Sequence, residues 1–171
     1  MIDVNAGHKT IPFIIFKFAL PQKNDIKKLR YSIDIRAPRE EVWRFMLGKE
    51  TYRTWINTAW PGSYYEGEWK EGGSIKFIGA DGSGTIATLV KQVPYEHLSI
   101  KHIAVLEKGG REDVTSESAK SWIGTMEQYI FTEKDGVTTL IVDIETSPDW
   151  EKMFNEGWPV ALQSLKGMIE K

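Results

Sequence analysis

Apolar residues occupy every second position in the segment 29–36, as Ile33 and Ile35 show, and the positions between them are charged or polar. This period of two predicts a β-strand with one buried face. Further along, apolar residues recur three and four positions apart, first around Val42 and again around Trp55. This spacing predicts two short helices directly after the strand.

Between residues 60 and 146 the pattern changes to short alternating runs separated by turn signals such as Asp81-Gly82 and Asp135-Gly136. An Asp-Gly pair between two such runs is a strong local signal for a β-hairpin. We therefore expect about six antiparallel strands here, including one over 122–133. The polar segment 107–121 is expected to be a mobile loop, either without further role or as a lid over a cavity.

The last part of the chain predicts one long helix. Ser147 is a suitable N-cap, and Pro148 fits the first helical position. Pro159 is expected to kink or divide the helix, because it has no N–H for the carbonyl of Asn155. An apolar stripe follows one helix face and consists of Trp150, Phe154, Trp158, Leu162, Leu165 and Ile169. The order of elements indicates an α+β fold in which this helix covers the apolar face of the sheet.

Composition excludes several classes of function. With 22 basic and 24 acidic residues the net charge is −2, which does not favour a nucleic-acid partner. Without cysteine there can be no disulfide, thiolate metal site or cysteine nucleophile. The three histidines are His8, His97 and His102, so we expect no metal site and no cofactor. The glycines around Gly82 lead into a strand rather than a helix, which favours a hairpin over a phosphate loop.

The N-terminal region contains the most apolar run of the chain, residues 11–20. Ten residues are too few to span a bilayer, which takes about 20. Lys17 interrupts the run and no small-residue cleavage site follows it, so a signal peptide is disfavoured. We expect residues 1–28 to be an extension, either an extra strand or a loose arm, and residues 29–171 to form the folded domain. The expected location is cytoplasmic.

Several short motifs follow one another along the chain. They are Ile35–Trp43, Trp60–Ser63, Trp69–Gly73, Asp81–Gly84, Trp122–Gly124, Asp135–Leu140 and Gly157–Pro159. Their order resembles the START-like (SRPBCC) superfamily, and within it the branch named after the C-terminal domain of the activator of Hsp90 ATPase. The resemblance implies a helix-grip fold, in which a curved antiparallel sheet of about six to seven strands grips the C-terminal helix. It also implies an apolar cavity between them, since members bind or process lipids, hormones and aromatic molecules.

The chain contains seven tryptophans, which is an unusually high number. Such large aromatic side chains either fill a core or line an apolar pocket. In this fold the side chains of Phe154, Trp158 and Leu162 would face the sheet, and Trp55, Trp60 and Trp69 would lie at the cavity mouth. Plain core packing is the alternative for each residue alone. Two large aromatic side chains beside a proline pack less densely in a core than aliphatic side chains do. The set as a whole therefore favours a cavity wall.

Two polar residues lie among apolar neighbours on their predicted strands. His102 shares a side with Leu98, Ile100, Ala104 and Leu106, and Glu127 shares one with Ile123, Tyr129 and Phe131. A buried polar side chain is costly unless it is hydrogen-bonded. One interpretation is a satisfied internal pair. The other is that His102 and Glu127, with Tyr129 nearby, orient the polar end of a ligand or act as acid and base.

These observations favour a carrier or sensor that binds a small hydrophobic or aromatic molecule in the cavity. An enzyme of the polyketide cyclase type is the first alternative, with His102 and Glu127 as its candidate catalytic residues. The second alternative is a chaperone-linked protein-interaction module. Hsp90 would be its partner, and this partner is less favoured than a small hydrophobic ligand.

Overall fold

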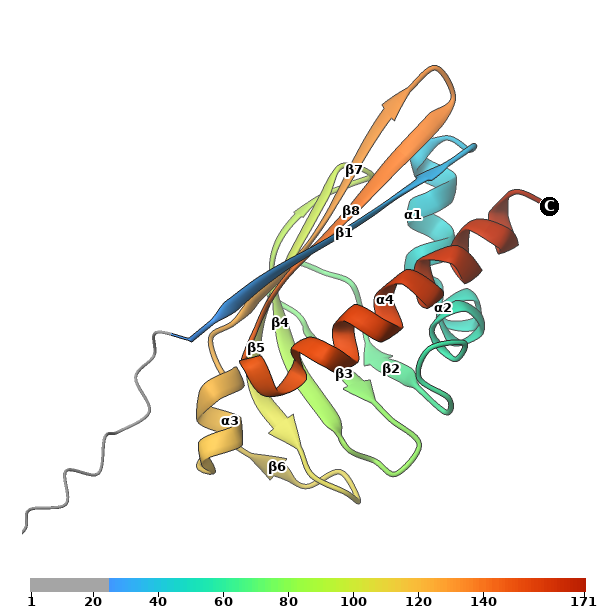
Figure 1. The fold of residues 1–171 in the computed structure, drawn as a ribbon. Coiled ribbons are helices and arrows are strands. Elements are labelled where there is room, and N and C mark those ends of the chain that lie inside the picture. The colour runs from blue at the N-terminus through green and yellow to red at the C-terminus, as the bar shows by residue number, and fades with distance from the viewer. Residues whose placement is uncertain (1–24) are drawn as a thin grey trace, which may run out of the picture.

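The computed structural model describes residues 25–171, in which a curved sheet wraps around one long helix (Figure 1). The elements are β1 (Lys27–Ile35), α1 (Arg39–Leu47), α2 (Lys49–Ile56), β2 (Tyr64–Gly67), β3 (Ser74–Ile78), β4 (Gly84–Val93), β5 (His97–Leu106), β6 (Glu112–Asp113), α3 (Glu117–Trp122), β7 (Met126–Lys134), β8 (Val137–Thr146) and α4 (Pro148–Ile169). The prediction of an α+β helix-grip fold is confirmed.

The sheet has eight antiparallel strands in the order β1-β8-β7-β5-β4-β3-β2, and the short β6 pairs with β5. Most neighbours are consecutive along the chain because tight turns join them. Asp135 and Gly136, with φ of 53° and 74°, form the turn between β7 and β8. Two residues with positive φ match the right-handed twist of the strands they connect. The first strand closes the order by pairing with β8.

The helix α4 crosses the inner, concave face of the sheet (Figure 1). Its residues Ala161, Leu162 and Leu165 are at most 2% exposed and belong to the main core. Pro159 does not divide the helix, which runs as one element from Pro148 to Ile169. The loss of one N–H donor costs a single hydrogen bond, and burial of the neighbouring turns on the sheet offsets it.

The expectation for 107–121 and 122–133 is wrong at the boundary between them. A helix, α3, ends at Trp122, and the strand β7 begins only at Met126. The carboxylate of Asp113 accepts hydrogen bonds from the backbone N–H groups of Thr115 and Ser116, and the hydroxyl of Ser116 caps Ala119. This capping signal lies in a polar segment without an apolar period, so periodicity overlooks it.

His102 lies on the predicted side with Leu98 and Ile100, but a β-bulge corrects the predicted side of Ala104. The pairing of β4 with β5 shifts register so that Ala87 pairs with His102 while Ile86 pairs with Ala104. The extra residue, Ile103, is 41% exposed. Beyond the bulge the alternation is reversed. Ala104 therefore joins Ile86 in a small separate cluster, instead of continuing the main core.

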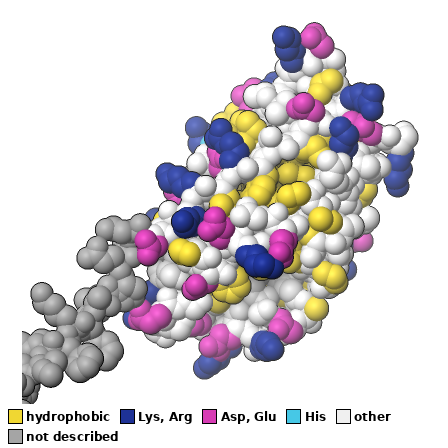
Figure 2. All heavy atoms as spheres, viewed as in Figure 1, with side chains coloured by type: hydrophobic (Ala, Val, Ile, Leu, Met, Phe, Trp, Pro, Cys, Tyr) yellow, Lys and Arg dark blue, Asp and Glu magenta, His cyan; other side chains and the backbone are white. Residues whose placement is uncertain are grey.

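The N-terminal expectations fall largely outside the described residues. The apolar run 11–20 and most of the expected extension 1–28 precede residue 25. The first strand starts at Lys27, two residues before the expected domain boundary. Among the helices of residues 25–171, none is long and apolar enough to cross a membrane. On the face seen in Figure 2, positive and negative side chains are interspersed, with apolar groups between them.

Candidate functional site

A cavity of about 320 Å³ lies between α4 and the inner face of the sheet. Its wall is rich in aromatic rings, which come from α2, β2, β3, α3, β7, α4 and the segment after α2. These are Tyr52, Trp60, Tyr64, Phe77, Trp122, Tyr129, Trp150, Phe154 and Trp158. Large apolar walls with a few polar groups are typical of small-molecule sites. The cavity is therefore the candidate functional site.

The helix α4 and the segment after α2 form one side of the cavity. Phe154 and Trp158 lie four residues apart, so they point to the same side of α4. The indole of Trp60 meets both rings edge-on, with centroids 6.5 Å and 5.9 Å away. Gly157 permits this contact, because a Cβ there would lie 2.2 Å from Cζ2 of Trp60. A glycine on α4 thus brings the Trp60 ring against the helix.

The end of the cavity near the start of α4 is formed by α3. The ring of Trp122 stacks on Phe154 with centroids 5.9 Å apart and an interplanar angle of 20°. On its other side Trp122 contacts the imidazole of His102, with centroids 4.4 Å apart. Sequence patterns assigned Trp122 to a strand, so this contribution to the site was missed. The Ser116 cap was the available signal.

A polar cluster lies on the sheet side of the cavity. Glu127 on β7 accepts a hydrogen bond at Oε1 from the hydroxyl of Tyr129. The imidazole Nε2 of His102, on β5, lies 3.5 Å from the other carboxylate oxygen, Oε2. The three residues are at most 7% exposed. The structure therefore brings together His102 and Glu127, whose meeting no sequence spacing predicted.

The contact between His102 and Glu127 is not a hydrogen bond. Neither ring nitrogen of His102 has a hydrogen-bond partner among the described residues, although Nε2 lies 3.5 Å from Oε2 of Glu127. The indole Nε1 atoms of Trp122 and Trp158 are likewise buried without a partner in this part of the chain. Buried polar groups are normally satisfied, so these unpaired groups suggest an occupant that carries a polar group of its own.

Two tyrosines keep the cluster supplied with hydroxyl donors. Burial raises the pKa of Tyr129 well above its ordinary value, and the negative charge of Glu127 adds to this rise. Tyr52 on α2 behaves alike, since burial and then Glu127 raise its pKa. Both hydroxyls therefore stay protonated across the physiological pH range. The sequence analysis did not identify Tyr52 as a site residue.

The predicted site residues divide into two groups. Those that line the cavity are Trp60, His102, Glu127, Tyr129, Phe154 and Trp158. Three do not line it. Trp55 is 1% exposed and its Nε1 donates to the carbonyl of Met46, Leu162 is core at 2%, and Trp69 packs against Tyr65 behind Phe77. Among residues 25–171, no three His, Asp or Glu side chains gather to hold a metal ion.

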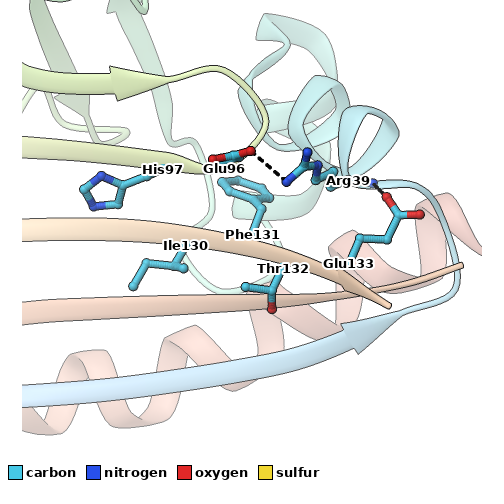
Figure 3. Close-up of a pocket in the computed structure, with 7 residues that line it drawn as sticks. All are labelled: Arg39, Glu96, His97, Ile130, Phe131, Thr132 and Glu133. Carbon is cyan, nitrogen blue, oxygen red and sulfur yellow. Dashed lines mark hydrogen bonds and ion pairs between the residues drawn. The ribbon is translucent and has the colours of Figure 1, made fainter. Parts of the chain in front are cut away.

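A second hollow, of about 420 Å³, lies at the ends of β5 and β7 beside the start of α1 (Figure 3). The guanidinium of Arg39 lies 3.1 Å from Glu96, and the backbone N–H of Arg39 donates to Glu133. Its charged groups are thus engaged with one another. The aromatic inner cavity remains the better candidate, since several of its buried polar groups have no hydrogen-bond partner among the described residues.

Solved structures of similar fold cover most of the chain. A protein from Chromobacterium violaceum is 17% identical, with a TM-score of 0.62 over 85% of this chain and 99% of its own. The Aha1 dimer from Colwellia psychrerythraea is 19% identical, with a TM-score of 0.62 over 84% and 96%. CalU16 from Micromonospora echinospora is 18% identical, with a TM-score of 0.57 over 86% and 78%. At these identities the likeness shows the fold.

Sequence comparison identifies the family. No curated protein matches the chain significantly. The model of the family described as "Activator of Hsp90 ATPase homolog 1-like protein" matches residues 36–170, which is most of the sequence and nearly all of the described fold. The chain belongs to this family.

Proposed function

We propose that this protein binds a small hydrophobic or aromatic molecule in the cavity under α4, as a carrier or sensor in the cytoplasm. The observation that carries the proposal is the cavity itself, about 320 Å³ of space walled by aromatic rings. Protein cores of this size normally contain few voids larger than a water molecule. An apolar ligand would fill this space and release water from its walls.

The hydrogen-bonding state of the wall supports the same function. The Nε1 donors of Trp122 and Trp158 and both ring nitrogens of His102 have no partner among the described residues. Each unsatisfied buried group costs about 1–3 kcal/mol. A ligand with a polar end would satisfy some of them. The proposal therefore covers apolar molecules that carry at least one polar group.

The proposal is tested by obstructing the cavity with a larger side chain. Val105 on β5 lines the cavity. We expect Val105→Phe to lower the affinity for apolar ligands at least tenfold, because the added ring occupies space that the ligand needs. Quenching of tryptophan fluorescence measures this affinity. Val160→Phe is the matched control, since Val160 is 48% exposed on α4 and does not line the cavity.

Equal ligand affinity in Val105→Phe and Val160→Phe would contradict the cavity as the binding site. Denaturation curves for both variants verify that each is folded. Native mass spectrometry of protein purified from its source adds an independent test. A retained small molecule that is lost in Val105→Phe would support the proposal, and its mass would identify the ligand.

An enzyme of the polyketide cyclase type is the second candidate. The observation in its favour is the His102–Glu127 pair inside the cavity, 3.5 Å apart, where an acid and a base could serve one bound molecule. An enzyme should lose turnover, but not its fold, in Glu127→Gln or His102→Ala. A carrier should bind its ligand and leave it unchanged. Only the name of the family supports the Hsp90-linked alternative.

A further inference from the structure

The described wall of the cavity contains an acidic side chain but no lysine or arginine. Glu127 is the only carboxylate among the described residues that line it. Oε1 of Glu127 accepts from Tyr129. Oε2 lies 3.5 Å from Nε2 of His102, which forms no hydrogen bond with it. One oxygen of this carboxylate therefore has no hydrogen-bond donor among residues 25–171.

Aromatic rings surround this carboxylate. Tyr129 lies on the same strand two residues away, and its ring is 6.2 Å from that of Trp158. Tyr52 reaches the cluster from α2, and Trp122 packs against His102. The face of an aromatic ring attracts a cation, most strongly where water is excluded. A carboxylate inside such a ring of aromatics presents two attractions for the same charge.

We propose that the cavity selects an organic ammonium ion, a small amphiphile whose protonated amine contacts Oε2 of Glu127 and whose apolar body fills the aromatic cavity. The inference rests on the proposed function and names its ligand class. A buried carboxylate without a counter-ion is costly, and an ammonium group supplies both the charge and the missing donors. A ligand carboxylate would meet Glu127 with like charge.

The competing partner of Glu127 is His102 itself. A protonated imidazole would neutralise the carboxylate, and the cavity would then favour neutral ligands. The other groups that face Glu127 are the hydroxyls of Tyr52 and Tyr129, which stay uncharged. From α4 the lining contributes Trp150, Met153, Phe154 and Trp158, none of them charged. The choice between an amine and a neutral ligand thus depends on Glu127 and His102.

The test compares three ligands of nearly equal shape: 4-phenylbutylamine, 4-phenylbutanol and 4-phenylbutanoate. Isothermal titration calorimetry at neutral pH gives the affinity of each. We expect the amine to bind at least about tenfold more tightly than the alcohol, in line with a desolvated cation–π contact. The carboxylate is expected to bind most weakly. In Glu127→Gln the advantage of the amine should vanish while the alcohol still binds.

The matched control is Glu66→Gln, which removes an exposed carboxylate on β2 that does not line the cavity. It should leave the order of the three ligands unchanged. If Glu127→Gln does not fold, Tyr129→Phe replaces it. The carboxylate then stays but loses the hydrogen bond from Tyr129, and the cavity should favour the amine more than the unchanged protein does.

Three results would overturn the inference. Equal binding of the three ligands would leave the proposed function intact and refute the ammonium class. A preference for the amine that persists in Glu127→Gln would refute the role of the carboxylate. No binding of any ligand, in a protein shown to be folded, would refute the inference and the proposed function together.

Discussion

A single glycine determines how closely the Trp60 ring approaches α4. Gly157 is buried in the middle of the helix, where glycine has a low propensity, and the adjacent indole explains its presence. A methyl group at this position would lie 2.2 Å from a ring carbon of Trp60. Local propensity therefore gives way to tertiary packing at this residue.

Gly157→Ala is expected to destabilise the protein by about 1–3 kcal/mol, because the Trp60 ring must move away from the helix. Gly167→Ala in the same helix is the control. A Cβ at Gly167 meets nothing within 4 Å, so alanine should stabilise by about 0.5–1 kcal/mol. Chemical denaturation measures both variants. Equal stability of the two would contradict the proposed packing.

Trp158 is the second residue with a measurable consequence. It is 4% exposed yet lines the cavity, so truncation enlarges space that is already open. We expect Trp158→Ala to cost less than the ~3–5 kcal/mol of an aromatic cut from a dense core, and to shift binding toward bulkier dyes.

Trp55→Ala provides the dense-core standard for this comparison, since Trp55 is 1% exposed in the main core and lines neither hollow. If Trp158→Ala loses as much stability as Trp55→Ala and the dye profile does not move, Trp158 is ordinary core.

At the scale of an element, α3 is the helix that holds Trp122 in the cavity wall. It has six residues, too few for independent stability. Its first turn depends on the Ser116 hydroxyl, which accepts the N–H of Ala119 at 3.1 Å. Asp113 fixes the approach to this cap, and the hydrogen bonds from Thr115 and Ser116 lower the pKa of its carboxyl. A short polar motif thus positions a large apolar ring.

Ser116→Ala should destabilise α3 by about 1 kcal/mol, the usual cost of losing an N-cap. Amide hydrogen exchange should accelerate between Ala119 and Trp122, and ligand affinity should fall because Trp122 is less well held. Ser118→Ala is the control, since this exposed serine lies inside the helix, where alanine is favoured. Unchanged exchange in Ser116→Ala would contradict the capping role.

For the whole molecule, the buried and partly buried tyrosines should make the free energy of unfolding decrease at alkaline pH. Burial chiefly raises the pKa of Tyr31 to about 12, with the charge of Glu151 adding to it. The pKa values of Tyr52, Tyr65 and Tyr129 are raised mainly by burial as well. Unfolded tyrosine ionises near pH 10. The folded state therefore holds its protons to higher pH than the unfolded state.

The free energy of unfolding should accordingly be constant with respect to these groups below about pH 10 and should fall as the pH rises toward 12. Urea denaturation at a series of pH values measures the decline, and absorbance of the ionised phenol follows the titration. Tyr31→Phe should reduce the slope between pH 10 and 12. An unchanged slope in that variant would show that Tyr31 does not contribute.

The sequence alone determined the elements whose signals are local. The alternation of 29–36, the Asp135-Gly136 turn and Pro148 at the start of the last helix were each sufficient, because such signals act within a few residues. The expected cap by Ser147 does not form through its side chain, whose hydroxyl makes no hydrogen bond to the first helical turn. The order of these elements, with the family motifs, then predicted the helix-grip fold. It also predicted which region of the fold would hold the cavity.

Only the tertiary structure decided which side chains meet there. Trp55, Trp60 and Trp69 look alike in the sequence, yet only Trp60 lines the cavity. The bulge at Ile103 and the cap of α3 determined the surroundings of His102. The approach of His102 to Glu127 joins two strands. Periodicity assigns a residue to a face of its own element, whereas contacts across elements depend on register and packing, which periodicity does not contain.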